Sequence, residues 1–342
     1  VIAIKPDTGE VLALESLPSF DPNVFSKGLK KEEWTALMED RRKPMLNRAV
    51  QSQYPPGSIF KIVTALAALE EGIIDPNTKI NCTGGINYGR WTFGCWKKGG
   101  HGPVDLHKAI VGSCDVYFYE LGKRLGIDKI YKYALAPGLG QETGIELMPV
   151  KEKKGLIPTE VWKRTKKKQP WYLGDTFISA IGQGFITITP IQASFMMASF
   201  SKGGYAPKPT ILKKEVNEDI EKINSKPMEF KQDNLRFISR ALFDVVNSSD
   251  GTAQSAKSEL IDIGGKTGTA QVVGKKSGLK GGRFADHAWF VAIAPIDKPE
   301  IVLSVFIEHG GSGGGAAAPI AKKAIEAYIK NKEQKDNKTI EH

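Results

Sequence analysis

Short apolar runs near the two ends of the chain predict strands. The first two runs are separated by a turn that contains Pro6, Asp7 and Gly9, which favours a strand–turn–strand unit. The other three fall in the last third of the chain. We therefore expect one antiparallel sheet with strands from both ends of the chain. The runs are residues 1–4, 10–14, 261–263, 288–294 and 301–307.

The middle of the chain carries helical patterns instead. Residues 58–69 and 189–200 are apolar almost all round, as expected of helices buried in a core. Pro190 suits the first turn of the second of these helices. Residues 106–125 also read as helical, with an interruption at Gly112-Ser113. Further helix is expected at 316–329.

This order of elements predicts the architecture. The fold class is α/β: an antiparallel sheet flanked by helices, from about 1–30 and 255–330, plus an all-helical lobe from about 45–250. The functional site is expected in the cleft between the two lobes. Residues 1–330 form this domain, and the polar residues 331–342 read as a flexible tail.

Composition narrows the class of protein. The chain has 342 residues, 41% of them hydrophobic, and a formal charge of +10. It contains no run of eighteen apolar residues and no signal segment, so any anchor is expected outside it. The densest basic run lacks the interleaved aromatics of nucleic-acid readers, which leaves a solvated loop or contact with an acidic lipid headgroup. That run contains Lys163, Arg164, Lys166, Lys167 and Lys168.

Ser58 and Lys61 are candidates for nucleophilic catalysis. Their spacing of three places both side chains on one face of a helix. A serine hydroxyl is a poor nucleophile until a base takes its proton, and a lysine with a lowered pKa can be that base. Pro55-Pro56-Gly57 places Ser58 at the start of the helix, where free backbone N–H groups can stabilise an oxyanion. A capping serine with a surface lysine is the alternative.

Two further motifs accompany this pair. Ser113 and Asp115 flank Cys114 at a helix break, where they could relay protons and hold Lys61, or simply cap a helix. A late strand carries a lysine, two threonines on one face, and a glycine that lets a substrate backbone approach closely. This strand motif would bind a terminal carboxylate. Its residues are Lys266, Thr267, Gly268 and Thr269.

The order and spacing of the three motifs resemble those of the penicillin-recognising serine enzymes. The residues 54–58, Tyr-Pro-Pro-Gly-Ser, and the residues 182–184, Gly-Gln-Gly, resemble the class B penicillin-binding proteins. The segments 96–102 and 308–311 resemble, more narrowly, the group of penicillin-binding protein 2, the elongation transpeptidases. The chain departs from the wider family where Ser-x-Asp replaces the usual Ser-x-Asn.

The resemblance implies a D,D-transpeptidase that cross-links peptidoglycan stem peptides through a serine acyl-enzyme and is acylated by β-lactams. Ser58 would attack the penultimate D-Ala carbonyl, with Lys61 as base and Ser113 returning the proton. Backbone N–H groups of Ser58 and Thr269 would form the oxyanion hole. The carboxylate would be held by Lys266, Thr267 and Thr269.

The resemblance also implies a setting. The partners would be D-Ala-D-Ala stem peptides, β-lactams, a SEDS-family glycosyltransferase and the rod-complex scaffold, with no nucleic acid. The domain would lie on the periplasmic side of a bacterial inner membrane, with its anchor and pedestal outside this chain. Rival hypotheses are a serine β-lactamase or D,D-carboxypeptidase of the same fold, and a non-catalytic sensor or scaffold.

The three cysteines suggest a structural zinc site. Cys82, Cys95 and Cys114 with His101 make a Cys₃His set, which is a standard closed tetrahedral site. The segment around them is Gly-rich and has little core of its own, so a metal would stabilise it. Alternatives are a Cys82–Cys95 disulfide with Cys114 free, or three buried thiols, and His107 is the alternative histidine. Catalysis itself would need no cofactor.

Overall fold

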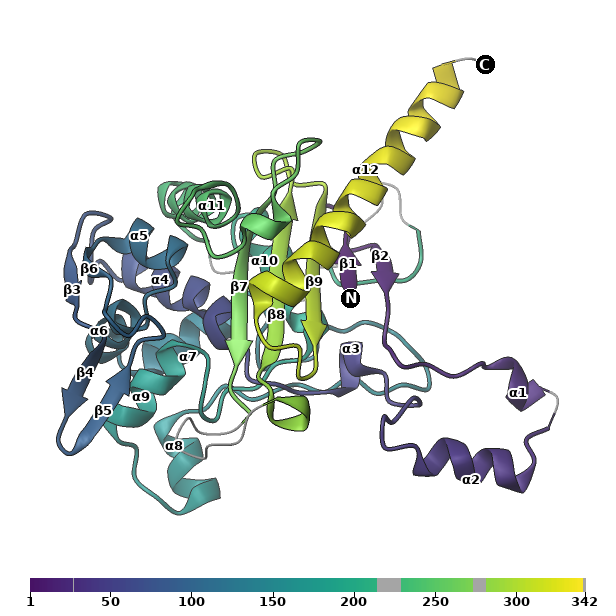
Figure 1. Cartoon of the computed structure of the whole chain (residues 1–342), viewed down its shortest axis with the longest axis horizontal. Helices are drawn as coiled ribbons and strands as arrows, with labels where there is room; N and C mark the ends of the chain where they lie inside the picture. Colours follow the sequence, from purple (N-terminus) through teal and green to yellow (C-terminus); the bar gives the residue numbers. More distant parts are fainter. Residues whose placement is uncertain (27, 214–228, 273–280, 341–342) are drawn as a thin grey trace.

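The structure is a computed structural model that describes residues 1–26, 28–213, 229–272 and 281–340. Its centre is a five-stranded antiparallel sheet of order β2-β1-β9-β8-β7. β1 pairs with β9, so the two ends of the chain meet in one sheet, as the sequence predicts (Figure 1). The strands are β1 (Ile2–Ile4), β2 (Val11–Leu14), β7 (Gly264–Ala270), β8 (His287–Ala294) and β9 (Ile301–Ile307).

Helices cover both faces of this sheet. In Figure 1, α12 (Ala318–Ile340) crosses in front of β8 and β9, while α10 (Pro190–Ser201) lies behind them and contacts the same strands. Thr189 caps α10 and Pro190 begins it, as expected. The sheet core contains the fully buried Trp289 and Phe290, so the sheet is a rigid support for its edge strand β7.

The second lobe is built around α4 (Lys61–Glu70), which is buried on nearly every side. It also carries two small antiparallel sheets within the Gly-rich segment, which the sequence pattern did not predict. One pairs β3 (Ile80–Cys82) with β6 (Gly102–Val104), and the other is the hairpin of β4 (Gly85–Tyr88) with β5 (Trp91–Gly94). The helices are α5 (Leu106–Val111), α6 (Asp115–Leu125), α7 (Ile127–Leu135), α8 (Glu160–Trp162), α9 (Leu173–Ala180) and α11 (Gln232–Asn247).

Three boundaries differ from the sequence prediction. Residues 261–263 precede β7 instead of forming a strand, because Asp262 and Ile263 bond through their carbonyls to Ile296 and Asn247. Helix α12 continues through Ile340, well into the segment read as a tail. The short helices α1 (Asn23–Ser26), α2 (Lys31–Glu39) and α3 (Arg48–Gln51) lie between β2 and the turn of Ser58, where the sequence pattern predicts no element, and α1 and α2 project from the body (Figure 1).

Within the described ranges, no helix is both long enough and apolar enough to cross a bilayer.

Candidate active site and metal centre

Ser58 lies in a single 3₁₀ turn, Gly57–Phe60, that leads directly into α4. The chain before it is fixed by hydrogen bonds. The indole N–H of Trp289 donates to Pro55 O at 3.0 Å, and the backbone N–H of Gly57 donates to Gly182 O at 2.8 Å. Ser58 itself remains partly exposed at the start of the buried helix. This placement leaves a hydroxyl accessible at a rigid helix start.

The edge strand β7 packs unusually close to this turn. A Cβ atom added to Gly57 would lie 2.6 Å from Thr269 O, and one added to Gly268 would lie 2.7 Å from Pro56 O. Gly57 also has φ +57°, a conformation that favours glycine. The backbone beside the Cβ position of Gly268 is thus the protein's own Pro56, and the approach of a substrate backbone to Gly268 stays a prediction. Gly268 lets β7 approach the Ser58 turn.

Lys61 is fully buried, and its ammonium group is held by the Ser-x-Asp motif. Its Nζ donates to Asp115 Oδ1 at 2.7 Å, to Ser113 O at 2.8 Å and to Ser113 Oγ at 3.2 Å. Among the described residues, no hydrogen bond joins Lys61 Nζ to Ser58 Oγ. The motif therefore holds Lys61 one turn from Ser58, with Ser113 Oγ in the same network.

Lys266 is also fully buried, and its Nζ lies 3.3 Å from Thr267 O. Burial, followed by the positive charge of Lys61, lowers the pKa of Lys266 well below its ordinary value. Side chains alternate along a strand, so Lys266 occupies the face opposite Thr267 and Thr269. Thr267 Oγ1 is bonded to Thr252 Oγ1 at 2.8 Å, whereas Thr269 is exposed.

Gln183 joins the two lobes at this point, because its side-chain amide donates to Thr269 O at 3.1 Å. A second connection runs behind the Ser58 turn. Tyr54 donates to Glu308 Oε1 at 2.5 Å, and Arg48 Nε donates to Glu308 Oε2 at 2.9 Å. Burial alone would raise the pKa of Glu308, but the hydrogen bonds from Tyr54 and Arg48 outweigh it and lower this pKa. Sequence reasoning noted Tyr54, Gln183 and Glu308 only within stretches of family likeness and gave them no role.

The three cysteines and His101 converge, as predicted. Their ligand atoms all lie within 4.8 Å of one another, and His101 Nδ1 is 3.6 Å from Cys82 Sγ and 3.5 Å from Cys95 Sγ. All three cysteines are buried and free. His107 lies elsewhere, 2.8 Å from Asp244 Oδ2.

The chemistry of these groups suits a metal. His101 Nε2 lies 3.2 Å from Gly112 O, so it carries the proton and leaves Nδ1 facing the sulfurs. The hydrogen bond that Cys114 donates lowers the pKa of Cys95 to about 5 and raises the pKa of Cys114, so without a metal it favours a thiolate at Cys95 alone of this pair. The cluster borders the Ser-x-Asp motif, since Cys114 lies between Ser113 and Asp115.

The basic run contains one buried lysine, and its other cations are exposed. Lys163 is 3% exposed, and its Nζ lies 2.5 Å from Asp175 and over the ring of Tyr172 at 4.8 Å. The other four cations of the run, at positions 164, 166, 167 and 168, are exposed. The run therefore combines one structural ion pair with a solvated positive surface.

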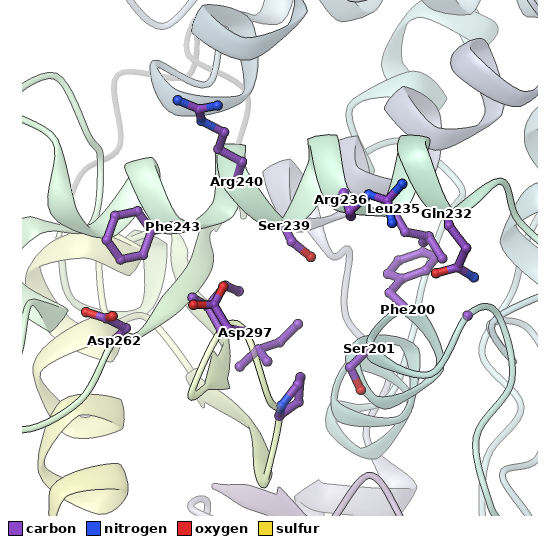
Figure 2. A pocket seen from close by; sticks show the side chains of 14 residues that line it. Phe200, Ser201, Gln232, Leu235, Arg236, Ser239, Arg240, Phe243, Asp262 and Asp297 are labelled. Atoms are coloured by element: carbon purple, nitrogen blue, oxygen red, sulfur yellow. The ribbon is translucent and has the colours of Figure 1, made fainter.

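A pocket of about 590 Å³ lies away from these residues, between α10, α11 and the connection from β8 to β9 (Figure 2). Arg240, Ser239 and Asp297 are among the side chains that line it. None of the residues predicted from the sequence as catalytic, binding or metal-ligating takes part. The pocket and the candidate site are thus separate features.

The chain is similar to several known proteins. It is 36% identical to the peptidoglycan D,D-transpeptidase MrdA of Haemophilus influenzae over 96% of this chain and 52% of the relative, so it spans about half the length of that protein.

Two solved structures share the fold. Penicillin-binding protein PBP2 of Helicobacter pylori, solved in complex with MreC, matches with a TM-score of 0.86 and 32% identity over 96% of this chain and 59% of that one. A ceftriaxone acyl-enzyme complex of penicillin-binding protein A from M. tuberculosis matches with a TM-score of 0.77 and 26% identity. The match covers 95% of this chain and 73% of that one.

The family of the penicillin binding protein transpeptidase domain matches residues 1–326, nearly the whole chain. This range includes the five-stranded sheet, the turn that carries Ser58 and the buried lysines. The chain therefore belongs to the penicillin-binding protein transpeptidase family, and its fold is that of this family.

Proposed function

We propose that this domain is a peptidoglycan D,D-transpeptidase that works through an acyl-enzyme on Ser58. The observation that carries the proposal is the position of Lys61, which is buried one turn from Ser58 and bonded to Ser113 and Asp115. Edge strand β7 packs on the same turn and presents Thr269 to solvent. Nucleophile, base, proton relay and substrate-binding strand are thus within one site.

In the proposed reaction, Lys61 acts from its neutral amine form: Ser58 Oγ attacks the carbonyl of the penultimate D-Ala while Lys61 accepts the hydroxyl proton and becomes the ammonium. The backbone N–H groups of Ser58 and Thr269 stabilise the oxyanion. Ser113 then delivers the proton to the nitrogen of the leaving D-Ala. The amine of a second stem peptide attacks the acyl-enzyme, forms the cross-link and releases Ser58. Asp115 holds Lys61 throughout.

The hydroxyls of Thr267 and Thr269 bind the terminal carboxylate of the donor peptide. Lys266 supports this binding from the other face of β7. Its lowered pKa is relevant here, because an arriving carboxylate favours the protonated, positive form of the lysine. β-Lactams carry an equivalent carboxylate and acylate the same serine. The acyl-enzyme reported for the relative from M. tuberculosis supports this step.

The partners of the whole protein are also proposals. Peptidoglycan stem peptides are the substrates, and a SEDS-family glycosyltransferase and the rod-complex scaffold are the protein partners. The structure of a relative in complex with MreC supports the scaffold. The domain is placed on the periplasmic side of the inner membrane, where its substrates lie.

We further propose that Cys82, Cys95, His101 and Cys114 hold one structural zinc ion. Tetrahedral coordination with Zn–S of about 2.3 Å and Zn–N of about 2.0 Å separates neighbouring ligand atoms by about 3.5–3.8 Å. The distances of 3.6 and 3.5 Å from His101 Nδ1 to two of the sulfurs fit this geometry. Four protein ligands leave no open position for water, so zinc would stabilise the fold and take no part in the reaction.

Product analysis tests the proposed reaction. The protein is incubated with a donor peptide ending in D-Ala-D-Ala and with an acceptor amine, and mass spectrometry separates cross-linked from hydrolysed product. We expect cross-linked product to dominate, and Lys61→Ala to lower its rate about 10²–10⁴-fold. Lys151→Ala, at an exposed lysine, is the matched control. If hydrolysed product dominates, the domain is better described as a carboxypeptidase. Rapid turnover of added penicillin would indicate a β-lactamase, and the absence of any reaction would indicate a non-catalytic sensor.

A further inference from the structure

Trp96 contacts both ends of the Ser-x-Asp segment, although its side chain is 54% exposed. Its indole N–H donates to Gly112 O and to Ser113 O, each at 3.0 Å. Its backbone N–H donates to Asp115 Oδ2 at 2.9 Å. A single residue therefore fixes the backbone before the motif and the carboxylate at its end.

Lys61 uses the same groups as acceptors. Ser113 O accepts from Lys61 Nζ at 2.8 Å and from the Trp96 indole at 3.0 Å. The carboxylate of Asp115 receives Lys61 on Oδ1 and the backbone of Trp96 on Oδ2. With one oxygen held, the rotation of the carboxylate is restricted and the other oxygen stays directed at Lys61. Trp96 thus supports each of the strongest contacts of the ammonium group.

The backbone at Ser113 needs such support. Its φ of +53° lies in the left-handed region, which a residue with a Cβ adopts only when its surroundings hold it there. Gly112 O also has His101 Nε2 as a partner at 3.2 Å, so it keeps a donor without the indole. Among the described residues, Ser113 O would then keep Lys61 Nζ as its one hydrogen-bond donor. Loss of the indole N–H is therefore expected to loosen the acceptor that Lys61 depends on.

We propose that Trp96 is a positioning residue for acylation: its indole N–H holds Ser113 O, and through it Lys61, in the geometry that activates Ser58. This inference rests on the proposed transpeptidase function, since it concerns the base of that reaction. Among the described residues, the hydrogen bonds of Trp96 run to Gly112, Ser113 and Asp115, and none runs to Ser58, so we expect it to act through Lys61. Its removal should therefore slow the chemical step and leave the binding of a β-lactam unchanged.

The test compares the zinc-loaded wild-type protein with Trp96→Phe and with a protein in which 3-benzothienylalanine replaces Trp96. The second variant keeps the ring size and the edge contact with His101 at 5.4 Å but has sulfur in place of the indole N–H. Trp91→Phe is the matched control, because Trp91 is 59% exposed in the neighbouring hairpin. Stopped-flow acylation by a fluorescent penicillin gives the rate constant k2 and the binding constant Ks separately.

We expect k2 to fall about 2- to 10-fold in both Trp96 variants, the range for one lost hydrogen bond. Ks, zinc content and the thermal midpoint should match those of the wild type, and Trp91→Phe should match it throughout. Equal k2 values in all four proteins would overturn the inference. A fall in k2 that follows lost zinc or a lowered thermal midpoint would also overturn it. A wild-type protein that is not acylated at all would refute the proposed function instead.

Discussion

The two halves of the proposed site are stabilised in different ways. On one side, β7 pairs with β8 along its whole length, is buried from Gly264 to Gly268, and packs its backbone against the turn of Ser58. On the other side, the segment 80–104 is Gly-rich, and β4 and β5 contribute no fully buried residue. Polar contacts and the Cys₃His cluster hold that segment against Asp115.

The comparison shows where the site is vulnerable. The β7 side is held by close backbone packing. The positions where a Cβ would stand at Gly57 and Gly268 lie nearer to backbone carbonyl oxygens than any Cβ tolerates. The 80–104 side has limited apolar packing, since Ile80 and Val104 are buried and Phe93 packs against the ring of Phe177. We expect the proposed metal to add to this packing in offsetting the entropy of ordering the segment. Substitutions should affect the first half through packing, and metal removal should affect the second.

Removal of zinc should have the largest effect. Chelation is expected to free residues 80–115 locally and to slow penicillin acylation by about 10²-fold, the lower end of the range for losing a general base. Hydrogen–deuterium exchange should rise in 80–115 and stay unchanged in β7, β8 and β9. The comparison would fail if exchange rose equally in both halves, or if metal-free protein with a mapped Cys82–Cys95 disulfide were fully active.

The same substitution in the two halves should give different results. A Cβ at Gly268 would lie 2.7 Å from Pro56 O, so Gly268→Ala should cost about 1–3 kcal/mol of unfolding free energy and slow acylation. Gly99 has open space at the Cβ position, so Gly99→Ala should change stability by less than about 0.5 kcal/mol. Urea denaturation of both variants checks this, and equal losses would contradict it.

The buried charge site at Lys266 should appear as a pH dependence of stability. Because the pKa of Lys266 is lowered in the folded state, the unfolded chain binds more protons between that pKa and the ordinary value of about 10.5. Wild-type stability should therefore rise with pH in this window, by up to about 1.4 kcal/mol per pH unit. The Lys266→Met variant lacks this dependence. Any excess of its unfolding free energy over that of the wild type should therefore shrink as pH rises. A constant difference from pH 6 to 9.5 would show that Lys266 is not buried as described.

Sequence patterns predicted the parts of the site that short-range rules govern. The spacing of Ser58 and Lys61, the helix break before Asp115 and the alternation along β7 follow from helix and strand periods. The Cys₃His grouping followed from residue chemistry, and the structure brings His101, not His107, to the three cysteines.

The remaining features depend on contacts between distant segments. For Gly268 the sequence predicts the approach of a substrate backbone, but it does not show that Pro56 lies beside this glycine. In the sequence Trp96 belongs only to a stretch of family likeness, and only the fold brings its two N–H groups to the Ser-x-Asp motif. The Tyr54–Glu308 bond spans 254 residues, beyond the reach of any local pattern.

The nucleophile is the central claim, and adduct mapping tests it most directly. Zinc-loaded protein is treated with benzylpenicillin and analysed by intact-mass spectrometry and peptide mapping. The account predicts one adduct per chain on the peptide that contains Ser58, and none in Ser58→Ala with an unchanged thermal midpoint. An adduct on another residue, or one that persists in Ser58→Ala, would contradict it.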